Sequence, residues 1–439
     1  MTHQKHLKDV IRARMARTGE SYVTARRQIL NSGDPPSTEV AGASKFQHFP
    51  GNVPIAAALR IVLANAGVKA PHTGRPFSEP MTFGIGGGIG AGAFAFHYQK
   101  ENWSSFFIAG RHLWQDDLAW LKGACDRFGV APLIRESSSP VAAEKAMNEL
   151  LTEGPTIAWV DKATLPYYGM PAWCSGGGYH VLVVYGVKGS SVVVGDLTDQ
   201  PIDVPIGDLR AARARIKKQK NRLLSISGPG RAIDLKSAIR DGLKACAQGL
   251  VKGRMRNFTL DAFRDWAERL HGSKSKDSWD ALFPPGPNLR RGLCSINEFI
   301  DHWGTGGGLM RPLMGEFLDE ASAALGDARM KSLGERYAGL GREWSALAEA
   351  ALPEEVPALR EARGLVKRKS ELFLSDGPEG DEERRAVCQR LDAPRPAKTE
   401  PFPLSDKEAG DLRRRLKAMA LSLCESEERA QKDLLRLVE

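Results

Sequence analysis

Residues 176–199 read Gly-Gly-Gly-Tyr-His-Val-Leu-Val-Val-Tyr-Gly-Val-Lys-Gly-Ser-Ser-Val-Val-Val-Gly-Asp-Leu-Thr-Asp. Two apolar, valine-rich runs flank Lys188-Gly189-Ser190, a pattern typical of a β-hairpin with a short glycine-containing turn. In an antiparallel pairing, His180 at the start of the first strand lies opposite Asp196 at the end of the second. An imidazole that a carboxylate orients in this way is the general base of a nucleophile–His–Asp arrangement. A one-residue slip of the register would separate the two side chains onto opposite faces.

The composition predicts a globular protein of two or three domains. Of the 439 residues, 42% are hydrophobic and 26% are charged, as in ordinary soluble chains. No apolar run is long enough to span a bilayer, and the charged start of the chain predicts no secretory signal. The six cysteines are far apart and lack metal-binding spacing, which predicts no metal site and no cofactor, and favours a reducing, cytoplasmic setting.

The net charge of +9 raises the question of an acidic partner. Residues 1–30 are strongly basic and predict two short helices around Thr18-Gly19-Glu20-Ser21, with Gly19 ending the first and Ser21 capping the second. A basic arm of this kind can bind nucleic acid or an acidic protein. It lacks the interleaved aromatic residues of single-strand binders, so the pattern favours a solvated basic surface over nucleic-acid binding.

Composition shifts divide the chain into segments. Ser405 and Glu408 predict a capping box that opens the last helix, and the leucine stripe of that helix must pack on the chain itself or on a second copy, as in a homodimer. The predicted segments are a basic helical arm (1–30), a linker (31–44), an α/β unit (45–228), a helical domain (229–374), a Pro- and charge-rich linker (375–404) and an amphipathic helix (405–439).

Two glycine clusters superficially match phosphate-binding loops. Residues 84–92 contain a G-x-G-x-x-A spacing, but no long apolar strand precedes them and no acidic residue follows at the usual distance. We therefore interpret these glycines as sites of close backbone packing. Residues 304–308 lack the Lys-Ser/Thr that follows a P-loop.

Several short motifs also follow one another in a recognisable order. They are Ala58-Leu59-Arg60, Ser78-Glu79, Phe83-Gly84-Ile85-Gly86, Gly110-Arg111, Asp161 before Leu165-Pro166-Tyr167, His180 before Val183-Val184-Tyr185-Gly186, Asp196, Gly304-Thr305-Gly306-Gly307-Gly308 with Arg311, and Phe317-Leu318-Asp319-Glu320-Ala321. In this order the chain resembles the family of butirosin biosynthesis protein H. The resemblance covers roughly residues 45–372.

The resemblance implies an α+β architecture. A papain-like (C39-peptidase-like) domain with an antiparallel sheet would precede an all-helical domain. The sequence pattern outside the resemblance adds helical extensions at both ends. The resemblance also implies acyl transfer in secondary metabolism, from a thioester on an acidic acyl carrier protein to an amine, which in the founding case is on an aminoglycoside. The expected machinery is a Cys at the start of the first helix, where the helix terminus favours thiolate, with a His and an Asp. By motif position, the catalytic His and Asp are His180 and Asp196, and the pocket residues are Ser78, Glu79, Arg111, Asp161 and Tyr167.

The chain departs from this pattern at the nucleophile. No Cys, Ser or Thr lies between Pro50 and Arg60, and Val53 and Pro54 stand where the Cys is expected. Gln47, six residues before Val53, has the spacing of a papain-type oxyanion donor.

Three interpretations follow. The chain is a pseudoenzyme that keeps the fold for binding, because losing one member of such a unit removes most of the rate. Alternatively, His180 takes a proton from an amine that attacks a bound thioester directly. In the third, the nucleophile is Cys174, which precedes His180 by six residues on a glycine-rich loop, or Cys125. A non-catalytic protein that binds a partner or nucleic acid through the basic arm is the alternative of a different class.

Overall fold

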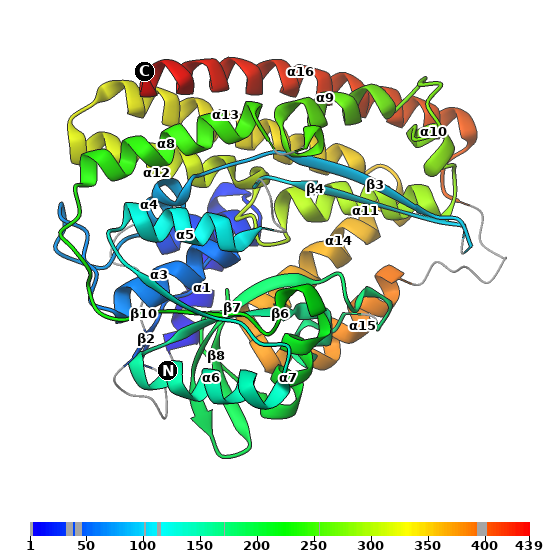
Figure 1. Cartoon of the computed structure of the whole chain (residues 1–439). Helices are drawn as coiled ribbons and strands as arrows, with labels where there is room; N and C mark the ends of the chain where they lie inside the picture. The colour runs from blue at the N-terminus through cyan, green and yellow to red at the C-terminus, as the bar shows by residue number, and fades with distance from the viewer. Residues whose placement is uncertain are drawn as a thin grey trace. The chain divides into compact units, whose positions relative to one another are not determined.

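The computed structural model describes residues 3–31, 38–39, 46–100, 102–111, 116–170, 172–253, 255–392 and 402–439. Helices and antiparallel strands are mixed in the chain, which confirms the α+β class (Figure 1). The chain forms two compact units that alternate along the sequence. Unit 1 consists of Met1–Gly87, Trp114–Gly242 and Lys369–Gln389, and unit 2 of Gly88–Leu113, Leu243–Arg368 and Arg390–Glu439.

Unit 1 contains a six-stranded antiparallel sheet. Its spatial order is β5 (Pro132–Arg135), β10 (Leu223–Ile226), β6 (Thr156–Asp161), β7 (Tyr179–Lys188), β8 (Ser191–Gly195) and β9 (Ile202–Pro205). The predicted hairpin is confirmed as β7–β8, in which Lys188 pairs with Ser191. Gly189 has a φ of +60° in the turn, which is why this position favours glycine. The two valine runs thus form adjacent central strands.

Helices cover both faces of this sheet. Figure 1 shows α3 (Pro54–Asn65) on one face, and α6 (Pro140–Glu153) and α7 (Ile206–Arg215) on the other. Because side chains alternate along a strand, alternate residues of β6, β7 and β8 share a core cluster with α6 and α7. That cluster includes Met147, Leu150, Ala158, Val160, Leu182, Val184, Val192, Val194, Leu209 and Ala212.

The first glycine cluster serves close packing, as predicted. Gly86 ends α4 (Glu79–Gly86), and a side chain at Gly86 would overlap the ring of Trp120. Trp120 belongs to α5 (Asp117–Arg127). The cluster therefore lets two helices of unit 1 approach each other.

The basic arm forms the two predicted helices, α1 (His3–Thr18) and α2 (Tyr22–Asn31). Gly19 has a φ of +72°, and the Ser21 hydroxyl accepts a hydrogen bond from the Thr24 N–H at 3.2 Å. Apolar side chains of both helices are buried in one cluster of unit 1 that contains Leu7, Ile11, Tyr22, Val23, Leu30, Ala57, Leu197 and Leu374. The arm is thus part of the folded body of unit 1.

Two segments differ from the predicted boundaries. Within the expected linker of residues 31–44, only Asn31 and the short strand β1 (Thr38–Glu39), which pairs with β2 (Gln47–His48), are described. The predicted linker of residues 375–404 instead begins with the end of a π-helical turn (Leu372–Asp376), a 3-10 turn (Gly377–Gly380) and α15 (Asp381–Asp392). Acidic residues open α15 and a basic residue lies near its end, and both interact favourably with the helix dipole. This charge order favours a helix, whereas the composition alone predicted a disordered linker.

Unit 2 combines a hairpin with a helical bundle. The hairpin strands are β3 (Gly92–Tyr98) and β4 (Trp103–Ala109). We predicted residues 45–228 as one unit, but the hairpin groups with the helices because Phe106 packs on Trp266 and Trp279, and Phe107 on Phe299. The helices are α8 (Leu235–Val251, which begins in unit 1), α9 (Leu260–Arg269), α10 (Trp279–Leu282), α11 (Pro287–Asp301), α12 (Arg311–Leu325), α13 (Ala328–Ala351), α14 (Pro357–Glu371, which ends in unit 1) and α16 (Asp406–Val438).

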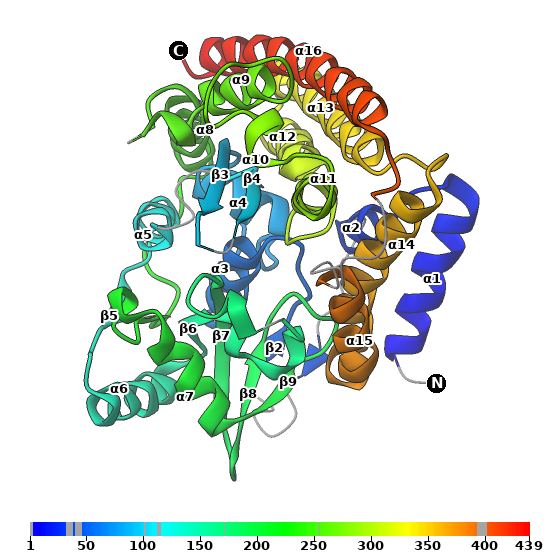
Figure 2. The ribbon, with the colours of Figure 1, turned by 90° about the vertical axis from the view of Figure 1, so that its right-hand side faces the viewer.

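The last helix, α16, packs on its own chain. Its predicted capping box is confirmed, because the Ser405 hydroxyl accepts from the Glu408 N–H and the Glu408 carboxylate accepts from the Ser405 N–H. Leu412, Leu416 and Leu423 are buried, and α16 lies along α9 and α13 (Figure 2). The apolar stripe is therefore covered within unit 2. No helix in the described ranges is both long and apolar enough to cross a bilayer.

Candidate functional site

His180 and Asp196 meet at one end of the β7–β8 hairpin. The His180 Nε2 lies 2.9 Å from Asp196 Oδ2 and 3.0 Å from Oδ1. Their side chains are only 2% and 1% exposed. The last pair of the β7–β8 ladder is Val183 with Gly195, so Asp196 leaves the strand beside the first residues of β7. The contact predicted from the sequence spacing is therefore present.

Two tyrosine hydroxyls complete the surroundings of this carboxylate. Tyr167 and Tyr168 donate to Asp196 Oδ2 at 2.9 and 3.0 Å, and the Leu197 N–H donates to Oδ1 at 2.8 Å. The Tyr168 hydroxyl also lies 3.0 Å from His180 Nε2. Tyr167 was predicted from its motif, whereas Tyr168 was missed although it is the next residue.

The electrostatics fix the protonation of this network. Burial favours a higher pKa for Asp196, but the charge and hydrogen bond of His180, with the donors from Leu197 and Tyr167, outweigh it and lower the pKa. Burial, followed by the charge of Asp196, raises the pKa of both Tyr167 and Tyr168, which keeps their hydroxyls neutral donors. An ionised carboxylate only accepts, so Nε2 of His180 carries the shared proton. His180 Nδ1 makes no hydrogen bond to any residue in the described ranges.

His180 lies on the face of the sheet that α6 and α7 cover. His180 pairs with Val160 across the β6–β7 ladder, and directly opposed residues point to the same face of a sheet. Val160 and Tyr167 both belong to the core cluster under α6 and α7. Leu197, the next residue after Asp196, packs instead with Ala57 of α3. The start of α3, where the family resemblance places a Cys, thus belongs to the other face.

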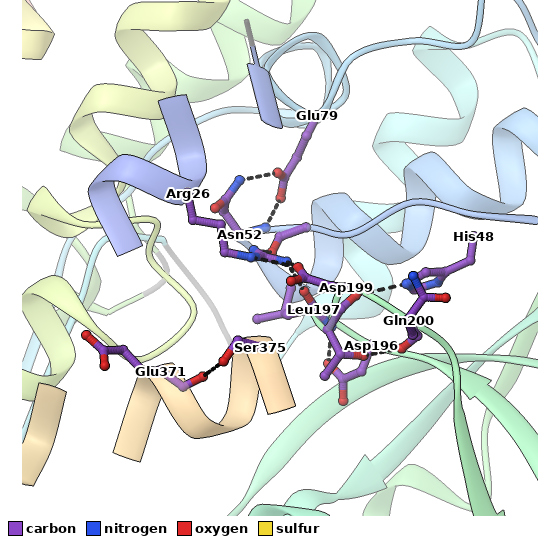
Figure 3. A network of polar contacts seen from close by, with 12 residues as sticks. Arg26, His48, Asn52, Glu79, Asp196, Leu197, Asp199, Gln200, Glu371 and Ser375 are labelled. Atoms are coloured by element: carbon purple, nitrogen blue, oxygen red, sulfur yellow. Dashed lines mark hydrogen bonds and ion pairs between the residues drawn. The ribbon is translucent and has the colours of Figure 1, made fainter. Parts of the chain in front are cut away.

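The start of α3 is occupied by a carboxylate of the chain itself (Figure 3). Glu79 Oε1 accepts from the backbone N–H groups of Asn52 and Val53 at 2.7 and 2.8 Å, and Oε2 accepts from the Asn52 side chain at 2.7 Å. Val53 is the N-cap residue and Pro54 follows at the first helical position. The free N–H groups at a helix start form a natural anion site. Here Glu79 fills that site, while Ser78 caps its own helix by accepting from Met81 N–H at 3.0 Å.

A buried arginine from α2 fixes the loop that carries Asp196. Arg26 Nη2 donates to Asp199 Oδ1 at 2.6 Å and to the Leu197 carbonyl at 2.7 Å, and Nη1 donates to the Gly51 carbonyl at 2.7 Å (Figure 3). Its side chain is 0% exposed. Arg26 was not predicted as a site residue, because nothing in the sequence distinguishes it from the other basic residues of the arm.

His48 secures the same loop from β2. Its Nε2 lies 2.9 Å from the Thr198 carbonyl and its Nδ1 lies 3.0 Å from the Tyr185 hydroxyl. Burial lowers the pKa of His48 to about 4, so the ring is neutral near pH 7. Nε2 therefore donates to the carbonyl and Nδ1 accepts from Tyr185, which makes His48 a structural support.

Asp161 shapes the loop that precedes His180. Its carboxylate accepts hydrogen bonds from the N–H groups of Ala163, Gly176 and Gly178 and from the Thr164 hydroxyl. A side chain at Gly178 would collide with Asp161, so the close approach requires glycine. All described bonds of Asp161 thus go to the loop.

The structure places Gln47 away from the start of α3, and it assigns Arg111 to unit 2. Gln47 is exposed on β2, and its backbone exchanges hydrogen bonds with Asn65. Asn65 ends the 12-residue α3, about 18 Å from the start of that helix, so Gln47 is not where an oxyanion donor is needed. Arg111 follows β4 and belongs to unit 2.

No hydrogen bond in the described ranges joins either candidate thiol to the His180 ring. Cys174 lies in a 3-10 turn (Ala172–Cys174). Cys125 is buried in α5, and burial raises the pKa of its thiol to about 12, which leaves it unreactive. No group of three or more His, Cys, Asp or Glu residues in the described part of the chain is placed to hold a metal ion.

Fold and site together define an α+β protein whose antiparallel sheet carries a buried His–Asp pair. Residues 56–197 match the family model described as butirosin biosynthesis protein H, N-terminal, and residues 207–368 match a domain of unknown function, DUF4872. The family predicted from the short motifs is therefore confirmed. No curated protein matches the chain. Arg26 and the segment 369–389 lie outside both matched regions.

Proposed function

We propose that this chain is a non-catalytic member of the butirosin biosynthesis protein H family, which uses the family scaffold to bind an acyl thioester or an amine. The observation that carries the proposal is the closed start of α3. Val53 and Pro54 provide no nucleophile, and the Glu79 carboxylate takes the two N–H groups that would otherwise stabilise an anion. A negative charge at this point opposes both thiolate and oxyanion formation.

The residues around the His180–Asp196 pair agree with a structural role for this pair. Asp196 accepts from His180, Tyr167, Tyr168 and the Leu197 N–H. A carboxylate with all its acceptor positions filled and almost no solvent exposure stabilises a packed core. In this proposal the His180–Asp196 pair stabilises the end of the β7–β8 hairpin and takes no part in catalysis.

The proposal is tested with acyl thioesters of pantetheine and a panel of primary amines that includes an aminoglycoside. We expect no thiol release above the uncatalysed rate and no acylated protein in intact-mass spectra. Titration with the non-hydrolysable amide analogue of the thioester, or with the aminoglycoside, is expected to give saturable binding. Thioester consumption that His180→Gln abolishes and the exposed control His97→Gln retains would overturn the proposal.

A second candidate function is transfer without an acyl-enzyme. It is favoured by one observation, that His180 Nε2 is held by Asp196 while Nδ1 makes no hydrogen bond in the described structure. In this mechanism the amine nitrogen attacks the thioester carbonyl and a C–N bond forms. Nδ1 takes the proton from that nitrogen, the C–S bond breaks, and the same proton passes to the departing thiolate. Amide and free thiol are the products.

The two functions differ in a measurable way. Direct transfer requires amine-dependent thiol release that falls by about 10²–10⁴ in His180→Gln, which is the range for loss of a general base. It also requires that intact-mass spectra show no acylated protein at any time. Binding without thiol release in the unmodified chain excludes direct transfer.

A further inference from the structure

Unit 2 contains a second polar constellation, built from the glycine-rich motifs and independent of the function proposed for unit 1. Arg311 opens α12 directly after Gly304–Met310. Its Nη1 donates to the Leu309 carbonyl at 2.9 Å and lies 3.4 Å from the Gly110 carbonyl. Gly110 in turn accepts from the Gly90 N–H at 2.6 Å. Three motifs that the sequence presents separately therefore meet at one side chain.

The backbone beside Arg311 is strained. Leu309 and Met310 have φ angles of +53° and +68°, and such left-handed conformations are costly for residues other than glycine. A side chain at Gly110 would collide with the Leu309 carbonyl. Strain of this kind persists only where the surrounding contacts enforce it, and here the contacts converge on Arg311.

A buried carboxylate from α16 neutralises Arg311. Arg311 Nε donates to Glu427 Oε1 at 2.6 Å, and the Trp344 Nε1–H donates to the same oxygen at 2.7 Å. The side chains of Arg311 and Glu427 are 0% and 1% exposed. The Arg311 guanidinium also lies over the rings of Phe263 and Trp344. The ion pair is thus enclosed by aromatic side chains.

Four polar atoms around this pair are buried without a hydrogen-bond partner in the described structure. They are Arg311 Nη2, Glu427 Oε2, the Tyr337 hydroxyl and Gln431 Nε2. Burial is the main cause that raises the pKa of Tyr337, so its hydroxyl stays protonated. Tyr337 precedes Trp344, which contacts Glu427, by seven residues on α13 and therefore shares its face of that helix. Gln431 follows Glu427 by four residues and therefore shares its face of α16. Buried polar atoms of this kind are normally satisfied by ordered water.

We propose that Arg311, Tyr337, Glu427 and Gln431 line an internal site that binds ordered water. The site offers N–H and O–H donors from Arg311, Tyr337 and Gln431 and one acceptor from Glu427. Water matches this set, because it accepts from the donors and donates to the carboxylate, and buried waters make two to four such bonds. The water connects α12, α13 and α16, so the last helix completes a site whose other residues, Arg311 and Tyr337, come from the matched region 207–368.

Two variants of the full-length chain test the site, because a hydrated site and a dry site predict opposite changes in the melting temperature. Tyr337→Phe and Gln431→Met each remove one polar group at nearly constant volume. If water is bound, each variant loses a hydrogen bond to it, and we expect the melting temperature to fall by about 2–4 °C. If the site is dry, each variant removes an unsatisfied group and the melting temperature stays the same or rises.

A crystal structure of the unmodified chain provides the second measurement. We expect a water peak within hydrogen-bond distance of Arg311 Nη2 and Glu427 Oε2. Tyr98→Phe, at a hydroxyl-bearing ring that is 45% exposed, is the matched control and should not change the melting temperature. Absence of the water peak together with unchanged or raised melting temperatures would overturn the proposal.

Discussion

Arg26 and Asp199 lie 173 residues apart in the sequence, yet Arg26 Nη2 is 2.6 Å from Asp199 Oδ1 and both side chains are buried. Through this pair the first helical arm holds the loop that presents Asp196 to His180. We expect Arg26→Met to lower the free energy of unfolding by about 3–5 kcal/mol, because it leaves a buried carboxylate without its partner. Urea denaturation measures this change. The control is Arg12→Met at an exposed position of α1, and an equal loss in both variants would contradict the prediction.

The basic arm is also the basis of the nucleic-acid hypothesis, and its internal contacts argue against it. Arg26 is buried, Arg14 pairs with Glu20 at 2.7 Å, and Lys8 pairs with Asp376. With these charges neutralised within the chain, we expect only weak binding to duplex DNA or single-stranded RNA. Fluorescence anisotropy at 50 and 200 mM salt measures it. Tight binding that falls by about 10³ or more across this range would support the nucleic-acid hypothesis instead.

The Asp196 carboxylate predicts a specific pH dependence of stability. Its pKa is lowered in the folded chain, so its contribution is fully present above the unfolded pKa of about 3.9 and is lost as the pH falls through the folded pKa. We expect Asp196→Asn to be strongly destabilised at pH 7 and to approach the unmodified chain below about pH 4. Urea titrations between pH 3 and 7 measure the difference. Asp203→Asn, an exposed control, should show little difference at any pH.

The tyrosine hydroxyls on Asp196 predict a loss of stability when one of them is removed. Tyr167 donates to Asp196 Oδ2 at 2.9 Å in a buried network, and Tyr167→Phe removes this donor while it keeps the ring. We expect the variant to lower the free energy of unfolding by about 1.5–3 kcal/mol, the range for a hydrogen bond to a charged group. Urea denaturation measures the change. An unchanged free energy of unfolding would show that the hydroxyl does not support the His180–Asp196 pair.

The Glu79 carboxylate predicts how an introduced thiol behaves. In Val53→Cys, the new side chain lies at a helix start, where a thiol normally becomes acidic, but next to a negative charge, which has the opposite effect. We expect the single variant to react slowly with iodoacetamide at pH 7.5. Adding Glu79→Gln is expected to accelerate the reaction about tenfold, which corresponds to one unit of thiol pKa. The rate at Cys174 is the internal control, and equal rates at position 53 in both variants would refute the role given to Glu79.

Local patterns predicted the parts of the structure that depend on nearby residues. The valine runs around Gly189 gave the hairpin and with it the His180–Asp196 contact, and Ser405 with Glu408 gave the start of α16. Contacts between distant segments were not predictable. Phe373 stacks on Tyr168 with ring centroids 4.6 Å apart, but residues 243–368 of unit 2 lie between the two in the sequence. No spacing rule connects a phenylalanine there to a tyrosine beside a distant His–Asp pair.

The alternation of the two units along the chain has a consequence for its synthesis. Leu374 belongs to the apolar cluster that also contains Tyr22, Ala57 and Leu197, and Phe373 covers Tyr168. These two residues leave the ribosome only after residues 243–368 of unit 2. Part of the apolar surface of unit 1 therefore stays exposed to solvent in the nascent chain while most of unit 2 is being synthesised. A ribosome that stalls before residue 373 holds a chain whose first unit is still incomplete.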